Sequence, residues 1–245
     1  MAATTLIVIP TYEERENIVS LIDRLFELHA DLDILVVDDN SQDGTADAVK
    51  EAQEQHGERL MLRVREGKGG RGSAVLEGLK HAIDQGYSHA FEMDADFSHE
   101  PAEVQQFLEM MTEHDLVIGS RYHPESKIYN WSRKRIIFSD FANRFARMIL
   151  RIPITDYTNG YRCYNQTALQ ALNFDAIEAK GYIVLSEVAY QLHRKNLRIG
   201  EVPTVFVNRQ RGTSNLSARE VKEAFLSVLA IRYPRLRRVL QKQIQ

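Results

Sequence analysis

Two aspartates separated by one residue, Asp94 and Asp96, stand where an apolar stretch gives way to a polar one. On an extended strand, residues two apart point to the same side, so both carboxylates would face one point. Two like charges that close are unfavourable unless a cation lies between them. Mg2+ and Mn2+ take carboxylate oxygens together with the phosphate oxygens of a bound substrate. The pair therefore suggests a metal–diphosphate site, although the same spacing also occurs in solvated loops.

Two further polar clusters follow stretches that are typical of strands. Residues 5–9 and 34–37 are continuous apolar, β-branched runs, as expected for strands buried on both faces of a parallel sheet. In open parallel sheets, ligands bind beyond the carboxyl ends of the strands. Together with Asp94 and Asp96, the clusters therefore predict one polar, ligand-binding edge of the sheet. Their members are Pro10, Thr11, Tyr12, Glu13 and Glu14 after the first run, and Asp38 and Asp39 after the second.

The first 120 residues alternate between predicted strands and predicted helices. Such alternation indicates β-α-β units and a parallel sheet. The helices are predicted from apolar residues that recur at helical spacing. The predicted strands cover residues 5–9, 34–37, 60–64, 89–93 and 116–119. The predicted helices cover residues 13–29, 73–85 and 101–111, and a further helix follows the polar turn at residues 38–45 and ends at residue 56.

A glycine-rich loop at residues 67–72 matches the dinucleotide-binding pattern G-x-G-x-x-G. The loop belongs to the third strand–helix unit, whereas the pattern normally lies in the first, and the first turn of this chain has no glycine. Backbone amides at a helix N-terminus bind phosphate whatever the cofactor. A dinucleotide-dependent dehydrogenase is therefore a distant alternative, and a flexible glycine turn is the simplest interpretation.

The second half of the chain loses the alternation and becomes basic. Residues 133–151 and 221–243 combine apolar and aromatic residues with Arg and Lys at helix-compatible spacing. Such helices suit the surface of an anionic membrane, but amphipathic helices also pack on their own domain. Between them, residues 156–162 are typical of a polar turn, residues 182–194 of a helix and residues 197–207 of a strand.

Charge is distributed unevenly along the sequence. Residues 1–120 carry 9 Lys and Arg against 25 Asp and Glu, while residues 121–151 carry 8 against 2 and residues 205–245 carry 9 against 2. Basic segments of this kind favour an anionic partner, and a solvated charged surface is the alternative. We expect no nucleic-acid partner.

The length of 245 residues is enough for one large α/β domain, with or without a C-terminal extension. No apolar run reaches the roughly 18–20 residues of a membrane span, and the first strand is not preceded by the basic segment of a signal peptide. The only cysteine, Cys163, leaves no intrachain disulfide. These features predict a cytoplasmic protein whose membrane attachment is peripheral or runs through a protein partner.

Ordered motifs extend from residue 9 to about residue 216, which is nearly the whole chain. They follow the predicted strand ends in the first half and continue through the polar and basic segments of the second. The motifs are residues 9–17, 37–45, 93–99, 119–122, 156–162 and 200–203, Arg209, and residues 212–216.

This set of motifs resembles the inverting family-2 glycosyltransferases, most closely the dolichol-phosphate (polyprenol-phosphate) mannose synthases. The resemblance implies the GT-A nucleotide-diphospho-sugar transferase fold, an α/β fold with a mostly parallel central sheet flanked by helices, and C-terminal amphipathic helices. It also implies a GT-A domain over residues 1–216, with a nucleotide-binding half (1–120) and an acceptor half (121–216). Residues 217–245 would form a basic, amphipathic helical extension.

The resemblance implies roles for individual residues. Asp96 would be the chief ligand of a divalent metal, Mg2+ or Mn2+, with Asp94 as a second ligand, and Asp96 and Arg121 would be catalytic. Lys134 and Arg135 match a basic pair of the family and are secondary candidates for binding the acceptor phosphate. Arginine suits phosphate because its planar guanidinium donates two bonds and keeps its charge. The residues implied in nucleotide-sugar binding are Pro10, Tyr12, Glu14, Val37, Asp39, Asp94, Ala95, Asp96, Arg121 and Arg209.

The reaction implied is transfer of a hexose, with mannose from GDP-mannose as the first choice, to a polyprenyl phosphate acceptor with inversion at the anomeric carbon. A phosphate monoester is anionic near neutral pH, because its second pKa is about 6, so a strong general base is not required. The protein would work peripherally on the cytosolic face of a membrane.

Three places depart from the family pattern. Asn215 stands where Lys is usual, Asp140 and Phe141 replace a basic residue and a glycine, and Leu185 replaces a glutamine. These changes leave the nucleotide half intact but keep two alternatives open. One is a family-2 transferase that uses another nucleotide sugar, such as UDP-glucose, or a non-lipid acceptor. The other is a non-catalytic module that binds nucleotide or a membrane surface.

Overall fold

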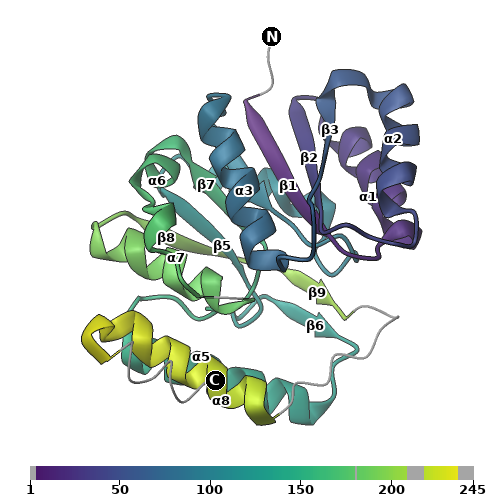
Figure 1. Cartoon of the computed structure of the whole chain (residues 1–245). Coiled ribbons are helices and arrows are strands. Elements are labelled where there is room, and N and C mark those ends of the chain that lie inside the picture. Colours follow the sequence, from purple (N-terminus) through teal and green to yellow (C-terminus); the bar gives the residue numbers. More distant parts are fainter. Residues whose placement is uncertain (1–3, 180, 209–217, 237–245) are drawn as a thin grey trace.

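A seven-stranded sheet with the strand order β3-β2-β1-β4-β7-β5-β8 forms the centre of the protein (Figure 1). The structure is a computed structural model that describes residues 4–179, 181–208 and 218–236. The strands of this sheet are β1 (Thr5–Thr11), β2 (Leu32–Asp38), β3 (Leu60–Val64), β4 (His89–Glu92), β5 (Leu116–Ser120), β7 (Arg162–Asn165) and β8 (Ile199–Pro203).

The sheet is mostly parallel, as predicted. β1 pairs in parallel with β2 and β4, β2 with β3, and β5 with β8, whereas β7 is antiparallel to both β4 and β5. Successive residues of β1 enter opposite cores, with Leu6 in one hydrophobic cluster and Ile7 in the other. This two-sided burial explains why β1 and β2 are continuous apolar runs in the sequence.

Helices cover both faces of the sheet (Figure 1). Apolar residues of α1, α2 and α4 pack in one core, and those of α3, α6 and α7 pack in the other. α5 and α8 lie side by side at the bottom of Figure 1, and buried residues of both helices join the second of these cores. The helices are α1 (Arg15–Leu28), α2 (Thr45–His56), α3 (Arg71–Asp84), α4 (Val104–Met110), α5 (Arg133–Leu150), α6 (Gln166–Ala171), α7 (Ile183–Arg194) and α8 (Ala218–Arg232), with short 3-10 helices at Gly57–Arg59, Pro101–Glu103, Phe174–Ala176 and Pro234–Leu236.

Strand β7, which the sequence does not predict, is inserted in the middle of the sheet. Its first residue, Arg162, is completely buried, and its guanidinium donates to the backbone carbonyls of Leu185 at 2.6 Å and Tyr157 at 3.1 Å. The polar residues 156–162 indicate a turn that extends to Arg162, whereas the strand already begins there. The buried arginine is stabilised by hydrogen bonds to carbonyl groups. Because arginine is charged, its position does not add to the apolar pattern from which a buried strand is predicted.

The prediction of one strand over residues 197–207 is wrong, because the segment forms two strands in different sheets. β8 belongs to the central sheet, whereas β9 (Val205–Val207) pairs with β6 (Lys127–Tyr129) in a small parallel sheet. The change occurs at the buried Thr204, whose hydroxyl donates to Glu103 at 2.5 Å. The backbone amide of Val205 donates to the same carboxylate at 2.7 Å, so Glu103 redirects the chain.

The described part of the predicted C-terminal extension, residues 218–236, forms α8 and the 3-10 helix Pro234–Leu236. Val228 and Ile231 are buried in one of the two cores, and the ring of Phe225 lies 4.6 Å from that of Phe145 on α5. The predicted boundary at residue 216 lies outside the described residues. Of the helices described, none is both long and apolar enough to cross a membrane.

Candidate active site

A buried hydrogen-bond cluster joins the carboxyl ends of β1 and β2. The hydroxyl of Thr11 donates to Asp38 at 2.8 Å, and the strand register places these two residues opposite each other. Asp38 also accepts from the backbone amide and the hydroxyl of Ser41, at 2.8 and 2.6 Å. Asp38 therefore stabilises the ends of β1 and β2. Its neighbour Asp39 instead contacts the segment that follows β3.

Asp39 connects β2 with the glycine-rich loop. One carboxylate oxygen accepts from Nη1 of Arg65 at 2.5 Å, and the other accepts from the backbone amide of Gly70 at 2.6 Å. Gly70 has a φ of +86°, which glycine adopts at little cost, and it immediately precedes α3. The backbone amide that precedes α3, that of Gly70, therefore donates to a carboxylate of the protein itself, that of Asp39.

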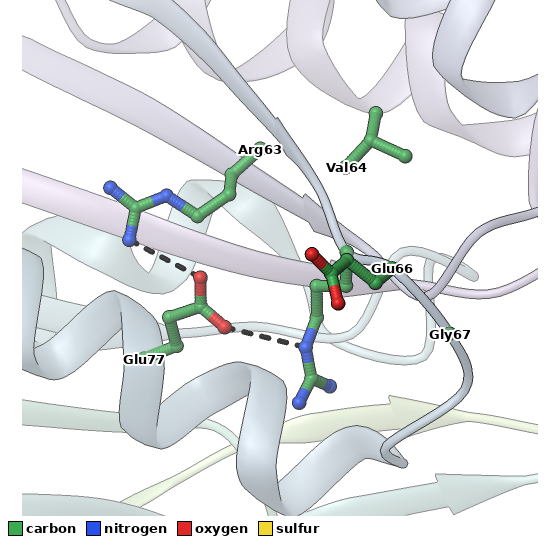
Figure 2. Close-up of a pocket in the computed structure, with 6 residues that line it drawn as sticks. Arg63, Val64, Glu66, Gly67 and Glu77 are labelled. Atoms are coloured by element: carbon green, nitrogen blue, oxygen red, sulfur yellow. Dashed lines mark hydrogen bonds and ion pairs between the residues drawn. The ribbon is translucent and has the colours of Figure 1, made fainter.

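Arg65 also lines an open pocket of about 490 Å³ at the β3 edge of the sheet (Figure 2). The wall is polar, since Arg63 and Arg65 each place a guanidinium nitrogen 3.3 Å from the carboxylate of Glu77. None of the site residues expected from the sequence lines this pocket, but Arg65 connects it with Asp39. The remaining lining residues are Val64, Glu66 and Gly67.

Asp94, Ala95 and Asp96 form the turn that follows β4. The carboxylate of Asp94 accepts from Nε of Arg71 at 2.6 Å, whereas that of Asp96 accepts from the backbone amide of Ser98 at 3.1 Å. The side chain of Ala95 is buried in a hydrophobic core. The two carboxylates thus lie close in the chain but have unequal surroundings.

The carboxylate oxygens at this turn suit a divalent metal that takes its remaining ligands from a bound substrate. Within residues 4–179, 181–208 and 218–236, no group of three or more His, Cys, Asp and Glu side chains could hold a metal ion. Asp94 and Asp96 offer two carboxylates, and a hard cation such as Mg2+ commonly binds one or two carboxylates together with substrate phosphates and water. A cation at this turn would therefore need further oxygen ligands from outside the protein, such as phosphate or water.

His99 fixes the backbone of the acidic turn. Its Nδ1 accepts from the backbone amide of Asp94 at 3.1 Å, and its Nε2 donates to Oδ1 of Asn159 at 3.0 Å. The amide nitrogen of Asn159 in turn donates to the carbonyl of Gly119 at 2.5 Å. Burial lowers the pKa of His99 below its ordinary value, which agrees with a neutral ring that accepts at one nitrogen and donates at the other.

Arg121 forms a buried, bidentate ion pair with Asp156. Its Nε and Nη2 donate to the two carboxylate oxygens at 2.7 and 2.8 Å, and Nη2 also donates to Thr158 at 2.7 Å. Burial alone would raise the pKa of Asp156, but the Arg121 charge and hydrogen bonds hold it below its ordinary value. The guanidinium expected to bind phosphate is therefore largely occupied by a carboxylate of the protein.

Asp156 links this ion pair to the acidic turn. One of its oxygens accepts from the backbone amide of Asn159 at 3.0 Å, and Asn159 is the partner of His99. Glu201 on β8 supports the same segment, because its carboxylate accepts from the backbone amides of residues 155 and 156 at 2.8 and 2.9 Å. The motif at residues 200–203 therefore has a structural role at this site.

Phe206 on β9 brings the remaining candidates to the same region. Its ring centroid lies 6.1 Å from that of His99 and 5.4 Å from that of Trp131. The guanidinium carbon of Arg121 lies 5.3 Å from the Trp131 centroid, and that of Arg135 lies 4.3 Å from it. The structure thus places Arg121 and Arg135 around one aromatic ring, and Arg135 also donates to Asn208 at 2.8 Å.

The other expected residues lie at varied depths. Tyr12 is exposed, and the ammonium of Lys68 lies 3.4 Å from its ring centroid. Glu14 accepts from the side-chain amide of Asn17 at 2.9 Å.

Val37 is completely buried in a hydrophobic core, so its side chain is not exposed at the sheet edge. Pro10 is partly exposed near the end of β1, Lys134 is exposed on α5, and Arg209 and Asn215 lie outside the described residues.

Three residues of this region carry no role in the sequence analysis. Arg71, His99 and Asn159 all lie within segments that are notable for other reasons, namely the glycine loop and two of the motifs. A cation inside the glycine loop is the one signal for Arg71 in the sequence, and it does not identify Asp94 as the partner. No sequence spacing indicates that His99 and Asn159 meet.

The central sheet is mostly parallel, is flanked by helices and carries carboxylates beyond the carboxyl ends of β1, β2 and β4. Solved structures of glucosyl-3-phosphoglycerate synthase from Mycobacterium tuberculosis share this fold. The complex with Mn2+, UDP and phosphoglyceric acid has a TM-score of 0.67 and 18% identity, and covers 95% of this chain and 78% of that chain. The complex with Mg2+ and UDP also has a TM-score of 0.67 and 18% identity, covering 95% of this chain and 79% of that one. The predicted GT-A fold is confirmed.

The model of Glycosyl transferase family 2 matches residues 6–172, and the chain belongs to this family. Polyprenol monophosphomannose synthase of Mycolicibacterium smegmatis is 36% identical over 91% of this chain and 85% of its own length. Undecaprenyl-phosphate mannosyltransferase of Micrococcus luteus is 39% identical over 95% of this chain and 97% of its own length. The protein is a glycosyltransferase, so the dehydrogenase and the non-catalytic module are not retained.

Proposed function

We propose that the protein transfers a mannosyl residue from GDP-mannose to a polyprenyl phosphate at a membrane surface, with inversion at the anomeric carbon. The observation that carries this proposal is a series of contacts between the acidic turn of Asp94 and Asp96 and the basic, apolar helix α5. Hydrogen bonds connect the turn through His99, Asn159 and Asp156 to Arg121. Arg121 and Arg135, which lies in the first turn of α5, both pack against the ring of Trp131. The extensive identity to the M. smegmatis and M. luteus enzymes supports mannose as the sugar and polyprenyl phosphate as the acceptor.

The donor would bind along the carboxyl ends of β1, β2 and β4. Asp39 is a suitable partner for the guanine base, because its two oxygens can accept from the two adjacent N–H groups that guanine presents, whereas uracil presents one. Arg65 and Gly70 each donate one hydrogen bond to these oxygens, and a carboxylate has further acceptor sites that the base would use. Tyr12 and the partly exposed Glu14 lie in the neighbouring turn and would contact the nucleoside.

Asp96, with Asp94 as the second carboxylate, would hold Mg2+ or Mn2+. When bound, this metal would supply positive charge that stabilises the departing diphosphate. The buried pair of Arg121 and Asp156 supports a positioning role for Arg121, because its Nε and Nη2 are already engaged. Arg135 and Lys134, in the first turn of α5, are the basic residues proposed for the acceptor phosphate.

The chemistry requires alignment more than proton transfer. A phosphate oxygen of the acceptor attacks the anomeric carbon while the bond between that carbon and the diphosphate oxygen breaks, and this displacement inverts the configuration. The acceptor is already anionic at neutral pH. The tasks of the protein are therefore to hold the attacking oxygen in line and to stabilise the leaving group.

Helix α5 provides the surface proposed to meet the membrane. Five of the eleven exposed large apolar side chains among the described residues belong to this one helix. Their concentration beside the basic residues of α5 fits an anionic membrane surface, where a polyprenyl phosphate presents its charged group. We propose the cytosolic face, with contact either direct or through a protein partner. The five residues are Ile136, Ile137, Phe138, Phe141 and Met148.

Transfer of labelled mannose from GDP-mannose to undecaprenyl or dolichyl phosphate in liposomes tests the proposal. We expect a mannosyl lipid to form with Mg2+ or Mn2+ present, and no product with EDTA. Parallel reactions with UDP-glucose test the alternative donor. This alternative is included because Asp140 and Asn215 depart from the family's sequence pattern. Product from UDP-glucose and none from GDP-mannose would replace the proposed donor, and product only on a non-lipid acceptor would replace the acceptor.

A further inference from the structure

Arg71, the first residue of α3, contacts three groups around the acidic turn. Its Nε donates to Asp94 at 2.6 Å, its Nη1 donates to Glu92 at 3.1 Å, and its Nη2 donates to the carbonyl of Gly160 at 3.2 Å. The side chain is only 15% exposed. All three guanidinium nitrogens are engaged, so the charge is held in one place.

One explanation is that Arg71 only neutralises Glu92. Glu92 is completely buried on β4, and its other oxygen accepts from the hydroxyl of Tyr164 at 2.6 Å. A buried carboxylate needs such partners. The shorter of the two Arg71 ion-pair contacts, however, is the one to Asp94, whose side chain is 22% exposed and could be solvated by water. Neutralisation of Glu92 alone does not account for that contact.

The absence of a side chain at Gly160 leaves room for the guanidinium of Arg71. A Cβ atom at this position would overlap Nη2 of Arg71 and approach its Cζ to 2.6 Å. Gly160 does not have one of the positive φ angles that favour glycine. Glycine is therefore needed here for space beside Arg71 and not for backbone conformation, which makes Arg71 a built part of the site.

We propose that Arg71 is a positioning residue of the donor site, which orients the carboxylate of Asp94 and leaves the metal chiefly to Asp96. This inference rests on the proposed function. A fixed cation beside one oxygen of Asp94 keeps that oxygen from a second cation, because the two charges would repel. Asp94 is then presented in one orientation, with its other oxygen directed by the Arg71 bond. Arg71 thus weakens metal binding while it fixes the geometry on which transfer depends.

Two variants separate this role from neutralisation of Glu92. Glu92→Gln removes the buried charge and keeps an oxygen that accepts from Tyr164. It is the reference protein with which the double variant is compared. Arg71→Met combined with Glu92→Gln then removes the cation without leaving an unpaired buried carboxylate. Gly160→Ala is the second probe, since it displaces the guanidinium while every charge remains in the chain.

The first measurement is the dissociation constant of Mn2+ with saturating GDP, from the electron paramagnetic resonance signal of free Mn2+. Relative to Glu92→Gln, we expect the double variant to bind Mn2+ about three- to tenfold more tightly, because a neighbouring like charge is gone. The second measurement is kcat for mannosyl transfer, which we expect to fall about 10- to 100-fold, because a loosened carboxylate misplaces the reacting groups. Gly160→Ala should shift both quantities in the same directions.

Equal Mn2+ affinity and equal kcat in Glu92→Gln and the double variant would overturn the inference and leave Arg71 with a purely structural role. If thermal unfolding shows that the double variant does not fold, Gly160→Ala decides by the same two measurements. Failure of the unmodified protein to bind Mn2+ in the presence of GDP would overturn the proposed metal-dependent function, and the inference with it. The two failures are therefore distinguishable.

Discussion

The Nε2 atom of His99 lies 3.0 Å from Oδ1 of Asn159, and this hydrogen bond joins residues that are 60 positions apart in the chain. On one side, His99 holds the backbone amide of Asp94. On the other, the backbone amide of Asn159 is held by Asp156, which is paired with Arg121. The acidic turn is therefore held, through His99, by residues 156–159, which lie some 60 positions further along the chain.

His99→Phe is expected to lower both stability and activity. Phenylalanine keeps a ring against Tyr161, whose ring centroid lies 4.9 Å away, but leaves the amide of Asp94 and the side chain of Asn159 without their partner. The free energy of unfolding in urea should fall by about 1–3 kcal/mol. The kcat of mannosyl transfer should also fall, because the acidic turn loses its anchor.

Tyr161→Phe is the matched control for His99→Phe. It keeps the stacked ring and removes only a hydroxyl that donates to the carbonyl of Glu100 at 3.0 Å, outside the chain of bonds from Asp94 to Asn159. Its kcat should stay close to that of the unmodified protein. Equal losses of kcat in both variants would contradict a specific role for His99.

Asp156→Asn is expected to destabilise the fold at neutral pH and to flatten its response to acid. The pKa of buried Asp156 is held below the ordinary 3.8, so the ionised carboxylate stabilises the folded state above that value. This stabilisation is lost as the pH falls through the folded-state pKa, in the range below about pH 4. The variant leaves Arg121 without its charged partner and should lose about 3–5 kcal/mol at pH 7.

Urea unfolding from about pH 2.5 to pH 7 measures the Asp156→Asn effect. The difference in unfolding free energy between the two proteins should shrink as the pH falls below about 4. A difference that stays constant across this range would show that the Arg121–Asp156 pair does not contribute through its charge.

Asp96→Asn is expected to remove most transfer activity while the fold remains. The side chain is partly exposed, and its contact with the backbone amide of Ser98 can be made by an asparagine oxygen. Loss of a carboxylate that supports charge stabilisation of the leaving group should lower kcat by at least about 100-fold. Circular dichroism and thermal unfolding report the fold, and near-normal turnover in this variant would remove Asp96 from the proposed metal site.

Replacement of Ile137 and Phe141 by glutamate should abolish binding to anionic liposomes. These side chains are 69% and 58% exposed on α5, so the change adds negative charge to the proposed membrane surface. The ring of Phe141 also lies 5.9 Å from that of Phe225 on α8, so thermal unfolding is measured to confirm that the variant is folded. The measurement is flotation with vesicles that contain anionic lipid. Val64→Glu, at an apolar side chain that is 46% exposed on β3, is the control and should float normally. Unchanged flotation of the α5 variant would place the membrane contact elsewhere.

The sequence by itself determined the alternation of strands and helices up to β5 and the polar edge of the sheet. β1 and β2 are buried on both faces, so their residues form continuous apolar runs, and the polar residues that follow must lie at the carboxyl ends of the strands. These signals are local, because each depends on residues within one strand–helix unit. Residue order alone is therefore enough to assign Asp39, Asp94 and Asp96 to one edge.

Only the tertiary structure decided which partner each charged residue takes. Arg71 and Asp94 are 23 positions apart, and Arg121 and Asp156 are 35 apart, so no periodicity relates them. Strand β7 escapes prediction because buried Arg162 is satisfied by backbone carbonyls that only the folded chain brings to it. Hydrophobic patterning depends on neighbouring residues, whereas ion pairs and buried hydrogen bonds depend on which segments meet in space. The composition of the site is therefore readable from the sequence, and the partners of Arg71 and Arg121 are not.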